Sequence, residues 1–207
     1  MPPLSSPNIS RDKIPKAERK YAYFIETTLN YLALRCTELD AAIALFETCA
    51  ATLADSQTEI RAKQLAWNWQ FMSAREAVSA VFKFSEDMEM IGVNLSKCPV
   101  LLRLVDSKAK RVATRKFKTA FPGIIGIRHS GQHGDIIYGS PEKLAKHVTG
   151  PIISINNLVG NTIETTYKRK KVSLEISGAT LTKLEQVRDA YWDAFWHLDP
   201  FGGPIAQ

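Results

Sequence analysis

The chain has 207 residues, of which 45% are apolar, so it is long enough to bury a core as one domain or as one domain with an appendage. It begins with no charged-then-apolar leader and has no apolar run of about 18 residues, which predicts a cytoplasmic protein without a membrane partner. The three cysteines, Cys36, Cys49 and Cys98, are odd in number and lie in apolar contexts, so we expect reduced core residues and no disulfide-linked partner.

The net charge of +6 is unevenly distributed along the chain. Residues 101–128 contain eight Lys or Arg and a single acid, Asp106, and the sequence KRKK at 168–171 adds four cations. These two segments carry a net charge of +11, which leaves −5 for the rest of the chain. Such local positive charge is typical of a surface that binds phosphates. A solvated helix face and a charged hairpin tip would have the same composition.

Residues 1–14 are rich in Pro and Ser and are predicted to form a flexible arm. From Pro15 to about residue 53, apolar residues recur at helical spacing. This pattern predicts one long helix, or two helices that are broken near Thr37.

A second long helix is predicted from the sequence ADSQTE, in which Ser56 or Thr58 would cap it, to about Asn94. Its apolar spacing predicts one buried stripe. The members of that stripe are Leu65, Trp69, Met72, Ala77, Ala80, Val81 and Phe84.

A third helix is predicted before Pro122, and its two faces differ in character. One face is apolar and consists of Val105, Ala109, Val112, Ala113, Phe117 and Ala120. The other is basic and consists of Lys108, Arg111, Arg115 and Lys118 at spacings of i, i+3, i+7 and i+10. We predict that these four cations form a nucleic-acid-binding stripe.

Pro122 and Gly123 break that helix, and the sequence IGIRHSGQHGD at 125–135 opens a short helix or a turn. This segment gathers the candidate catalytic residues Arg128, His129 and His133. Glycines at 131 and 134 favour a turn, because each costs about 1 kcal/mol relative to alanine inside a helix.

Residues 148–199 are predicted to contain two or three antiparallel strands and a closing helix. Alternation at Ile163, Thr165 and Tyr167, and again at 172–176, indicates strands joined by the turn signals VGN and KRKK. The closing helix should begin at Thr180 or Thr182. The predicted fold class is therefore mainly α: an antiparallel helical bundle over 15–147, a small β-hairpin and last helix over 148–199 packed on it, and a tail at 200–207.

The sequence RHSGQH at 128–133 has the Arg-x4-His spacing of the HEPN superfamily, and the chain resembles that family over residues 15–147. The segments SAREAVSAVFKFSEDMEMI, CPVL and FPGIIGIRHSGQHGD are also similar to a group of bacterial helical proteins of unassigned role. The resemblance implies a helical bundle that forms a homodimer, in which two motifs meet across a cleft. Many family members are metal-independent ribonucleases, and the glycines and the Gln before His133 depart from the usual family pattern.

The chemistry of the motif suits RNA cleavage. Histidine titrates near pH ~6.5 and can carry a proton in either direction near neutrality. A guanidinium offers a planar set of donors to phosphate oxygens. The resemblance therefore implies His133 as general acid or base and Arg128 as the group that stabilises phosphate charge. Residues five apart on a helix point about 140° from each other, so one helix alone does not bring this pair together.

Other interpretations remain open from the sequence. His129 and His133 have the i, i+4 spacing of a two-histidine metal site, with Asp135 as a third ligand, but no HExxH pattern supports it, so we expect no metal and no cofactor. Arg128 and the histidines could instead cap a helix end by binding backbone carbonyls. The alternative function is a non-catalytic interaction module, with a homodimer or partner interface formed by the aromatic residues of the last helix, Tyr191, Trp192, Phe195 and Trp196.

Overall fold

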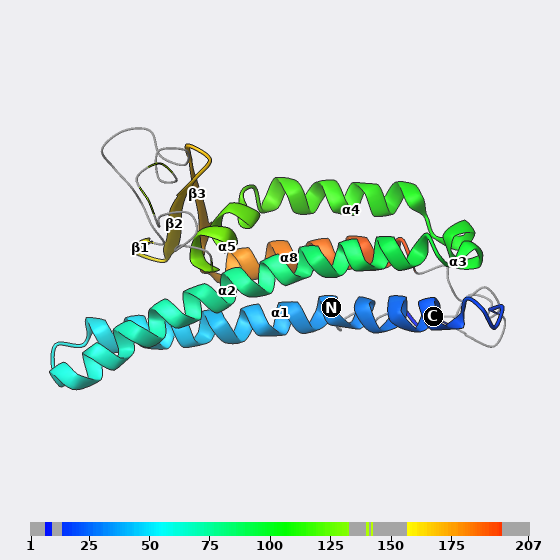
Figure 1. Ribbon diagram of the computed structural model, residues 1–207. Helices are drawn as coiled ribbons and strands as arrows, with labels where there is room; N and C mark the ends of the chain where they lie inside the picture. Colours follow the sequence, from blue (N-terminus) through cyan, green and yellow to red (C-terminus); the bar gives the residue numbers. More distant parts are fainter. Residues whose placement is uncertain (1–6, 10–13, 133–139, 141, 143–156, 196–207) are drawn as a thin grey trace. The chain divides into compact units, whose positions relative to one another are not determined.

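The computed structural model describes residues 7–9, 14–132, 140, 142 and 157–195 (Figure 1). The predicted fold class is confirmed: a long antiparallel helix pair is followed by shorter helices, a three-stranded antiparallel sheet and a closing helix. The helices are α1 (Arg19–Ala54), α2 (Ile60–Leu95), α3 (Pro99–Leu104), α4 (Ser107–Ala120), α5 (Ile124–Gln132) and α8 (Gly178–Asp193). The strands are β1 (Asn157–Val159), β2 (Thr162–Tyr167) and β3 (Lys170–Glu175).

The chain divides into two compact units, which are described separately below. Unit 1 consists of Met1–Cys36, Lys83–Ala120 and Lys183–Gln207. Unit 2 consists of Thr37–Phe82 and Phe121–Thr182. Each unit contains part of α1, α2 and α8.

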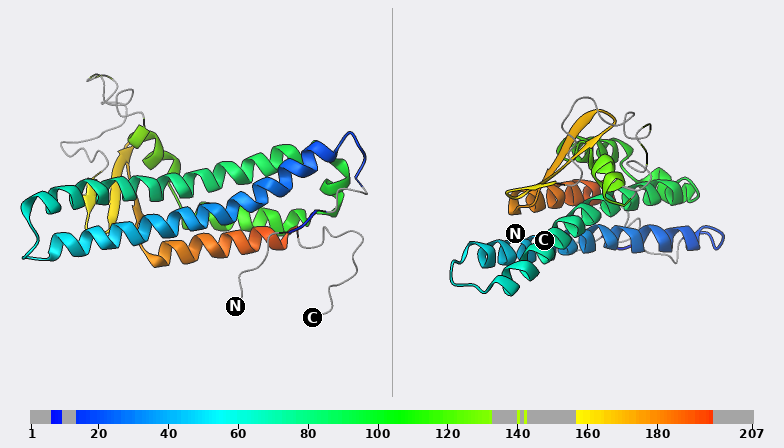
Figure 2. Two further views of the ribbon diagram at one scale, coloured as in Figure 1. Left: turned by 90° about the horizontal axis from the view of Figure 1, so that it is seen from below. Right: turned by 60° about the vertical axis from the view of Figure 1, so that its left-hand side comes forward.

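Within each unit, α1 and α2 run antiparallel and meet along one narrow seam (Figure 2). The buried residues of α1 alternate at spacings of four and three: Ile25, Leu29, Leu32, Cys36, Leu39, Ile43 and Phe46. In α2 the same spacing connects seven buried residues: Ala74, Ala77, Val81, Phe84, Met88, Ile91 and Leu95. Ser73, Val78 and Ala80 beside this series are buried too, so the buried face of α2 is wider there. A seven-residue repeat keeps such a seam turned toward its partner helix, which explains why α1 continues as one helix past Thr37.

Three residues of the predicted α2 stripe are not buried. Leu65, Trp69 and Met72 are 47%, 52% and 63% exposed, so this part of the prediction is wrong. Near the turn that joins α1 and α2, the buried residues of α2 are those that face α1, such as Ala66 and Gln70. Contact with a single partner helix buries a narrower stripe than packing inside a larger bundle does. The remaining predicted members, from Ala77 to Phe84, are buried as expected.

The turn between α1 and α2 is held by an aspartate. Asp55 Oδ1 accepts a hydrogen bond from the backbone N–H of Gln57 at 2.9 Å, and its Oδ2 accepts from the Thr58 hydroxyl at 3.0 Å. These bonds lower the pKa of the Asp55 carboxyl. The predicted cap is therefore wrong: Thr58 donates its hydroxyl backward into the turn, and α2 begins only at Ile60.

Unit 1 is a helical bundle whose core includes the aromatic residues of α8. Tyr191, Trp192 and Phe195 are at most 3% exposed. The Tyr191 hydroxyl donates to the carbonyl of Met88 at 3.2 Å, and Trp192 Nε1 donates to that of Leu29 at 3.1 Å. Their rings fill the space between α8 and the helix pair, so these three side chains are not available to the partner interface that was the alternative; Trp196 lies outside the described residues.

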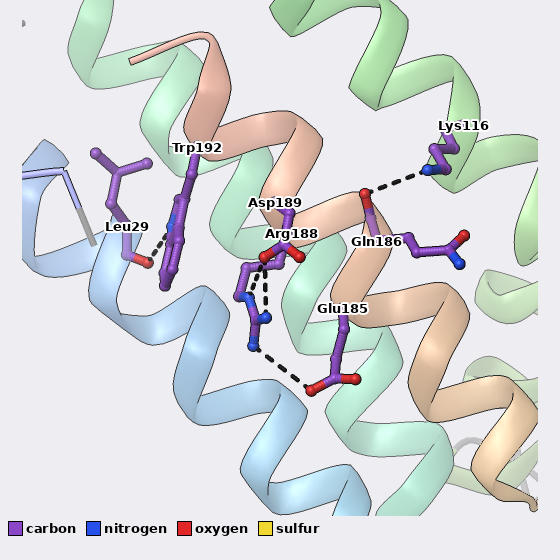
Figure 3. A network of polar contacts seen from close by, with 7 residues as sticks. All are labelled: Leu29, Lys116, Glu185, Gln186, Arg188, Asp189 and Trp192. Carbon is purple, nitrogen blue, oxygen red and sulfur yellow. Dashed lines mark hydrogen bonds and ion pairs between the residues drawn. The ribbon is translucent and has the colours of Figure 1, made fainter. Parts of the chain in front are cut away.

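Polar contacts complete the packing of α8 within unit 1 (Figure 3). The Arg188 guanidinium binds Asp189 at 2.9 Å and approaches Glu185 at 3.8 Å. Lys116 Nζ of α4 donates to the Gln186 carbonyl at 3.4 Å. α4 also packs on α2 through stacked rings of Phe84 and Phe117, whose centroids are 5.7 Å apart.

Some residues of the predicted arm are held in unit 1. Ile9 and Ile14 are each 2% exposed, and the backbone N–H of Ile9 donates to Glu26 at 3.5 Å.

Within the described ranges, no helix is both long and apolar enough to span a bilayer. The cytoplasmic location remains a prediction from the sequence.

Thiol reactivity tests the core directly. All three cysteines are free and buried, as predicted. Burial raises the pKa of Cys36 to about 12 and also raises the pKa of Cys49 and of Cys98. Because thiolates are the reactive species, we expect none of them to react with Ellman's reagent in the native protein at pH ~8. All three should react after unfolding in guanidinium chloride, and rapid titration of a thiol in the native protein would contradict the packing.

Candidate nucleic-acid interface

The sheet of unit 2 is a meander of short strands joined by two tight turns. β1 pairs with β2 and β2 pairs with β3, both antiparallel. Ile163, Thr165 and Leu174 are buried, as the alternation predicted, and α5 packs against β2 and β3. The sheet therefore presents its turns and its outer residues to solvent, while its inner face holds α5.

Two glycines allow α5 to lie close to the sheet. A Cβ on Gly126 would meet Tyr167 Cδ1 at 2.7 Å, and one on Gly123 would meet Val172 Cγ1 at 2.6 Å. Gly123 also has a φ of 85°, a conformation that side chains disfavour. Glycine at both positions thus sets the distance between α5 and the hairpin that carries Tyr167.

The segment at 124–132 is helical, which decides between the two predicted conformations. α5 continues through Gly131 to Gln132, so the favoured turn is wrong up to that residue. Arg128, the first candidate, is half-buried, with its guanidinium carbon 5.3 Å from the centroid of the Phe82 ring. This geometry is typical of a cation–π contact.

The Arg128 side chain is half-buried, and two of its three guanidinium nitrogens are enclosed. Its Nε and Nη1 atoms are buried and have no hydrogen-bond partner among the described residues. The alternative in which Arg128 caps a helix by binding backbone carbonyls is therefore not seen at these two nitrogens. A buried N–H donor without an acceptor is unfavourable, and an anion bound at these two nitrogens would supply the acceptors.

His129, the second candidate, lies in a different environment. It is exposed, and its ring is parallel to that of Tyr167, with centroids 6.0 Å apart and planes at 7°. Neighbouring residues on a helix point about 100° apart, so His129 faces away from the Phe82 side of α5. The structure therefore places Arg128 on Phe82 and His129 on Tyr167.

The third candidate, His133, directly follows α5 and lies outside the described residues, as does Asp135. The described part of the chain contains no group of three or more His, Cys, Asp or Glu that could hold a metal ion. Whether His133 approaches Arg128 thus stays a prediction.

The basic stripe lies on α4, in unit 1. Lys108, Arg111, Arg115 and Lys118 are all exposed, as predicted. Asp106 caps the helix by accepting hydrogen bonds from the backbone N–H groups of Lys108 and Ala109 at 2.8 and 2.9 Å. Six of the 14 residues of α4 are cations and none is an acid, so the helix offers a continuous positive surface.

One residue of the predicted apolar face of α4 is not buried. Val112 is 54% exposed, while Ala113 and Phe117 are buried. The apolar face is therefore narrower than predicted, and Val112 lies on the solvent side among the cations.

Sequence reasoning missed the two aromatic residues that hold the candidates. Phe82 was not singled out because it lies between seam positions of α2, and Tyr167 was assigned only to a strand. Tyr167 could have been noticed because it directly precedes KRKK, and Gly126 because a second glycine, Gly123, lies three residues before it.

The chain matches no protein-family model, no curated protein and no solved structure.

Substitution of Gly126 tests the close approach. In Gly126→Ala, the new Cβ would overlap Tyr167, and overpacking of about 1–3 kcal/mol should exceed the gain of about 1 kcal/mol in helix propensity. We expect a net loss of up to about 2 kcal/mol in the free energy of unfolding, measured by urea denaturation. The matched control is Gly92→Ala in α2, where the Cβ meets nothing within 4 Å among the described residues. It should gain up to about 1 kcal/mol, and an equal gain in both variants would contradict the contact.

Proposed function

We propose that the protein binds RNA and cleaves it without a metal ion, as an endoribonuclease of HEPN type. Arg128 stabilises the charge on the scissile phosphate, and His133 acts as general acid or base. His129 lies beside Arg128 in the chain and is a second candidate for proton transfer. The resemblance of the Arg-x4-His motif supports this assignment, as does the environment of Arg128.

The observation that carries the proposal is that two buried guanidinium nitrogens of Arg128 have no hydrogen-bond partner among the described residues. The Phe82 ring supports one face of the group, while Nε and Nη1 retain N–H donors without acceptors among the described residues. A phosphoryl group supplies both oxygen acceptors and the missing negative charge. Arginine in such a position binds a phosphate more strongly as charge accumulates on its oxygens.

The reaction requires two proton transfers and no co-reactant. The 2′-hydroxyl of a ribose loses its proton to a base and attacks the adjacent phosphorus. The bond to the 5′-oxygen breaks, and that oxygen receives a proton from an acid. The products are a 2′,3′-cyclic phosphate and a free 5′-hydroxyl, and Arg128 stabilises the negative charge that gathers on the phosphoryl oxygens in between.

The basic stripe of α4 would hold the RNA backbone. Its four exposed cations have no carboxylate partner among the described residues, and binding to phosphates would release counterions. This surface carries no information about base sequence, so its contribution is affinity. The homodimer implied by the resemblance would bring a second motif to the site.

Cleavage of a generic single-stranded RNA in excess chelator tests the assignment. We expect wild-type protein to leave cyclic phosphate ends, and His133→Ala and Arg128→Met each to lose activity by about 10²–10³-fold. Arg128→Met should keep the free energy of unfolding or raise it by up to about 2 kcal/mol, because it replaces two buried donors that lack acceptors with an apolar chain of similar length. Neutralising the α4 stripe to Gln should weaken binding at low salt and leave the rate at saturating RNA unchanged.

The opposite results would reject the proposal. Activity that persists in Arg128→Met excludes Arg128 as the phosphate ligand. A large loss of stability in the same variant would mean that Arg128 has a structural partner, and the activity loss would then report unfolding.

A specific observation also favours the second candidate, an interaction module that forms a homodimer. Leu65, Trp69 and Met72 lie at i, i+4 and i+7 on α2 and are exposed in unit 2. Two helix pairs that face each other through such stripes form a four-helix arrangement and bury them. Sedimentation should show a dimer that Trp69→Glu converts to a monomer, while Glu89→Gln on the same helix leaves it intact. A wild-type monomer would contradict this candidate.

A further inference from the structure

The turn between β2 and β3 holds two basic residues in a backbone conformation that most residues avoid. Tyr167 pairs with Lys170, so the loop consists of Lys168 and Arg169 alone. Their φ angles are 47° and 64°. Both angles are in the left-handed region, which a type I′ turn requires at its two central positions and for which Asn-Gly is the preferred sequence.

The other turn of the same sheet shows the usual solution. Gly160 begins the loop between β1 and β2 and has a φ of 59°, which glycine adopts without strain. Lys168 and Arg169 instead carry a Cβ, for which this region is unfavourable. A basic pair that is kept against this cost is typical of a functional position.

Electrostatics raise the cost further. Lys168, Arg169, Lys170 and Lys171 are consecutive and exposed. Lys171 forms an ion pair with Glu164 at 2.8 Å. The other three have no carboxylate partner among the described residues, so their charges repel one another at the tip of the hairpin.

An aromatic pair lies directly beside this charge. Lys168 Nζ lies 5.4 Å from the centroid of the Tyr167 ring, and the Tyr167 ring is parallel to that of the exposed His129. Proteins bind single-stranded nucleic acid by combining cations, which contact the phosphates, with aromatic rings, on which the bases stack. A base-paired duplex hides those faces.

We propose that the β2–β3 tip is a subsite for single-stranded RNA, in which Lys168 and Arg169 bind successive phosphates and a base stacks on the His129–Tyr167 pair. The inference rests on the proposed function and specifies its substrate class. The subsite lies in unit 2, the unit that also contains Arg128, and it is built from residues that the Arg-x4-His motif does not include. It acts in binding and contributes no group to the bond-breaking step.

The test is a substitution that improves the turn while removing its charge. Lys168→Asn/Arg169→Gly installs the sequence preferred in type I′ turns. The probe is a labelled 2′-O-methyl RNA of about 12 nucleotides, which lacks the attacking hydroxyl and so measures binding alone. Loss of two phosphate contacts should lower the slope of log affinity against log salt by about 1.4 and weaken binding about 25-fold near 0.1 M salt. The melting temperature should rise in the same variant.

The control is Lys16→Gln/Lys183→Gln, which removes the same charge from two exposed residues elsewhere. If the tip variant binds no more weakly than this control, the proposal is overturned, even where Arg128→Met abolishes cleavage and the proposed function stands. Equal weakening for an RNA duplex, or for vesicles rich in anionic lipid, also overturns it, because the tip would then be a general polyanion surface. Loss of single-stranded RNA binding in a protein that shows no cleavage supports the subsite and rejects only the catalytic proposal.

Discussion

A narrow seam of apolar residues between α1 and α2 is the constraint on which the other elements depend. Because the buried positions repeat every seven residues, each helix has only one stripe fixed by its partner, and its other faces are available to later parts of the chain. In unit 1, α4 and α8 cover such a face through Phe117 and Tyr191. In unit 2, Phe82 lies outside the seam and supports Arg128. The same geometry leaves Trp69 in solvent.

Periodicity made much of the fold predictable, and its failures have definite causes. The long helices, the strands at 162–167 and 170–175 and the exposed face of α4 follow from spacing alone. Leu65, Trp69 and Met72 share the spacing of a buried stripe, but only a third layer of structure would bury them. The site was predictable only in part: Arg128 could be selected from its motif, whereas its contact with Phe82 joins residues 46 positions apart and leaves no local pattern.

The candidate site concentrates features that oppose folding. Two buried guanidinium nitrogens of Arg128 have no hydrogen-bond partner among the described residues, and Lys168 and Arg169 adopt left-handed backbone. Elsewhere in unit 2, by contrast, Gly123 and Gly126 stand at two positions that a side chain would disturb. These departures from local preference lie on cations that contact aromatic rings, and they are the features on which the proposed binding of an anionic ligand rests.

Because α4 contains no acidic residue, added salt has two opposing effects on the protein. The six cations among the 14 residues of α4 repel one another. The capping carboxylate of Asp106 lies at the N-terminal end of the helix, where a negative charge is favourable. Added salt screens this repulsion and stabilises the free protein, yet it weakens attraction to any polyanion. A bound polyanion performs the same screening and therefore shifts the folding equilibrium as well as filling the surface. A polyanion bound to α4 would therefore stabilise the folded protein, most strongly at low ionic strength.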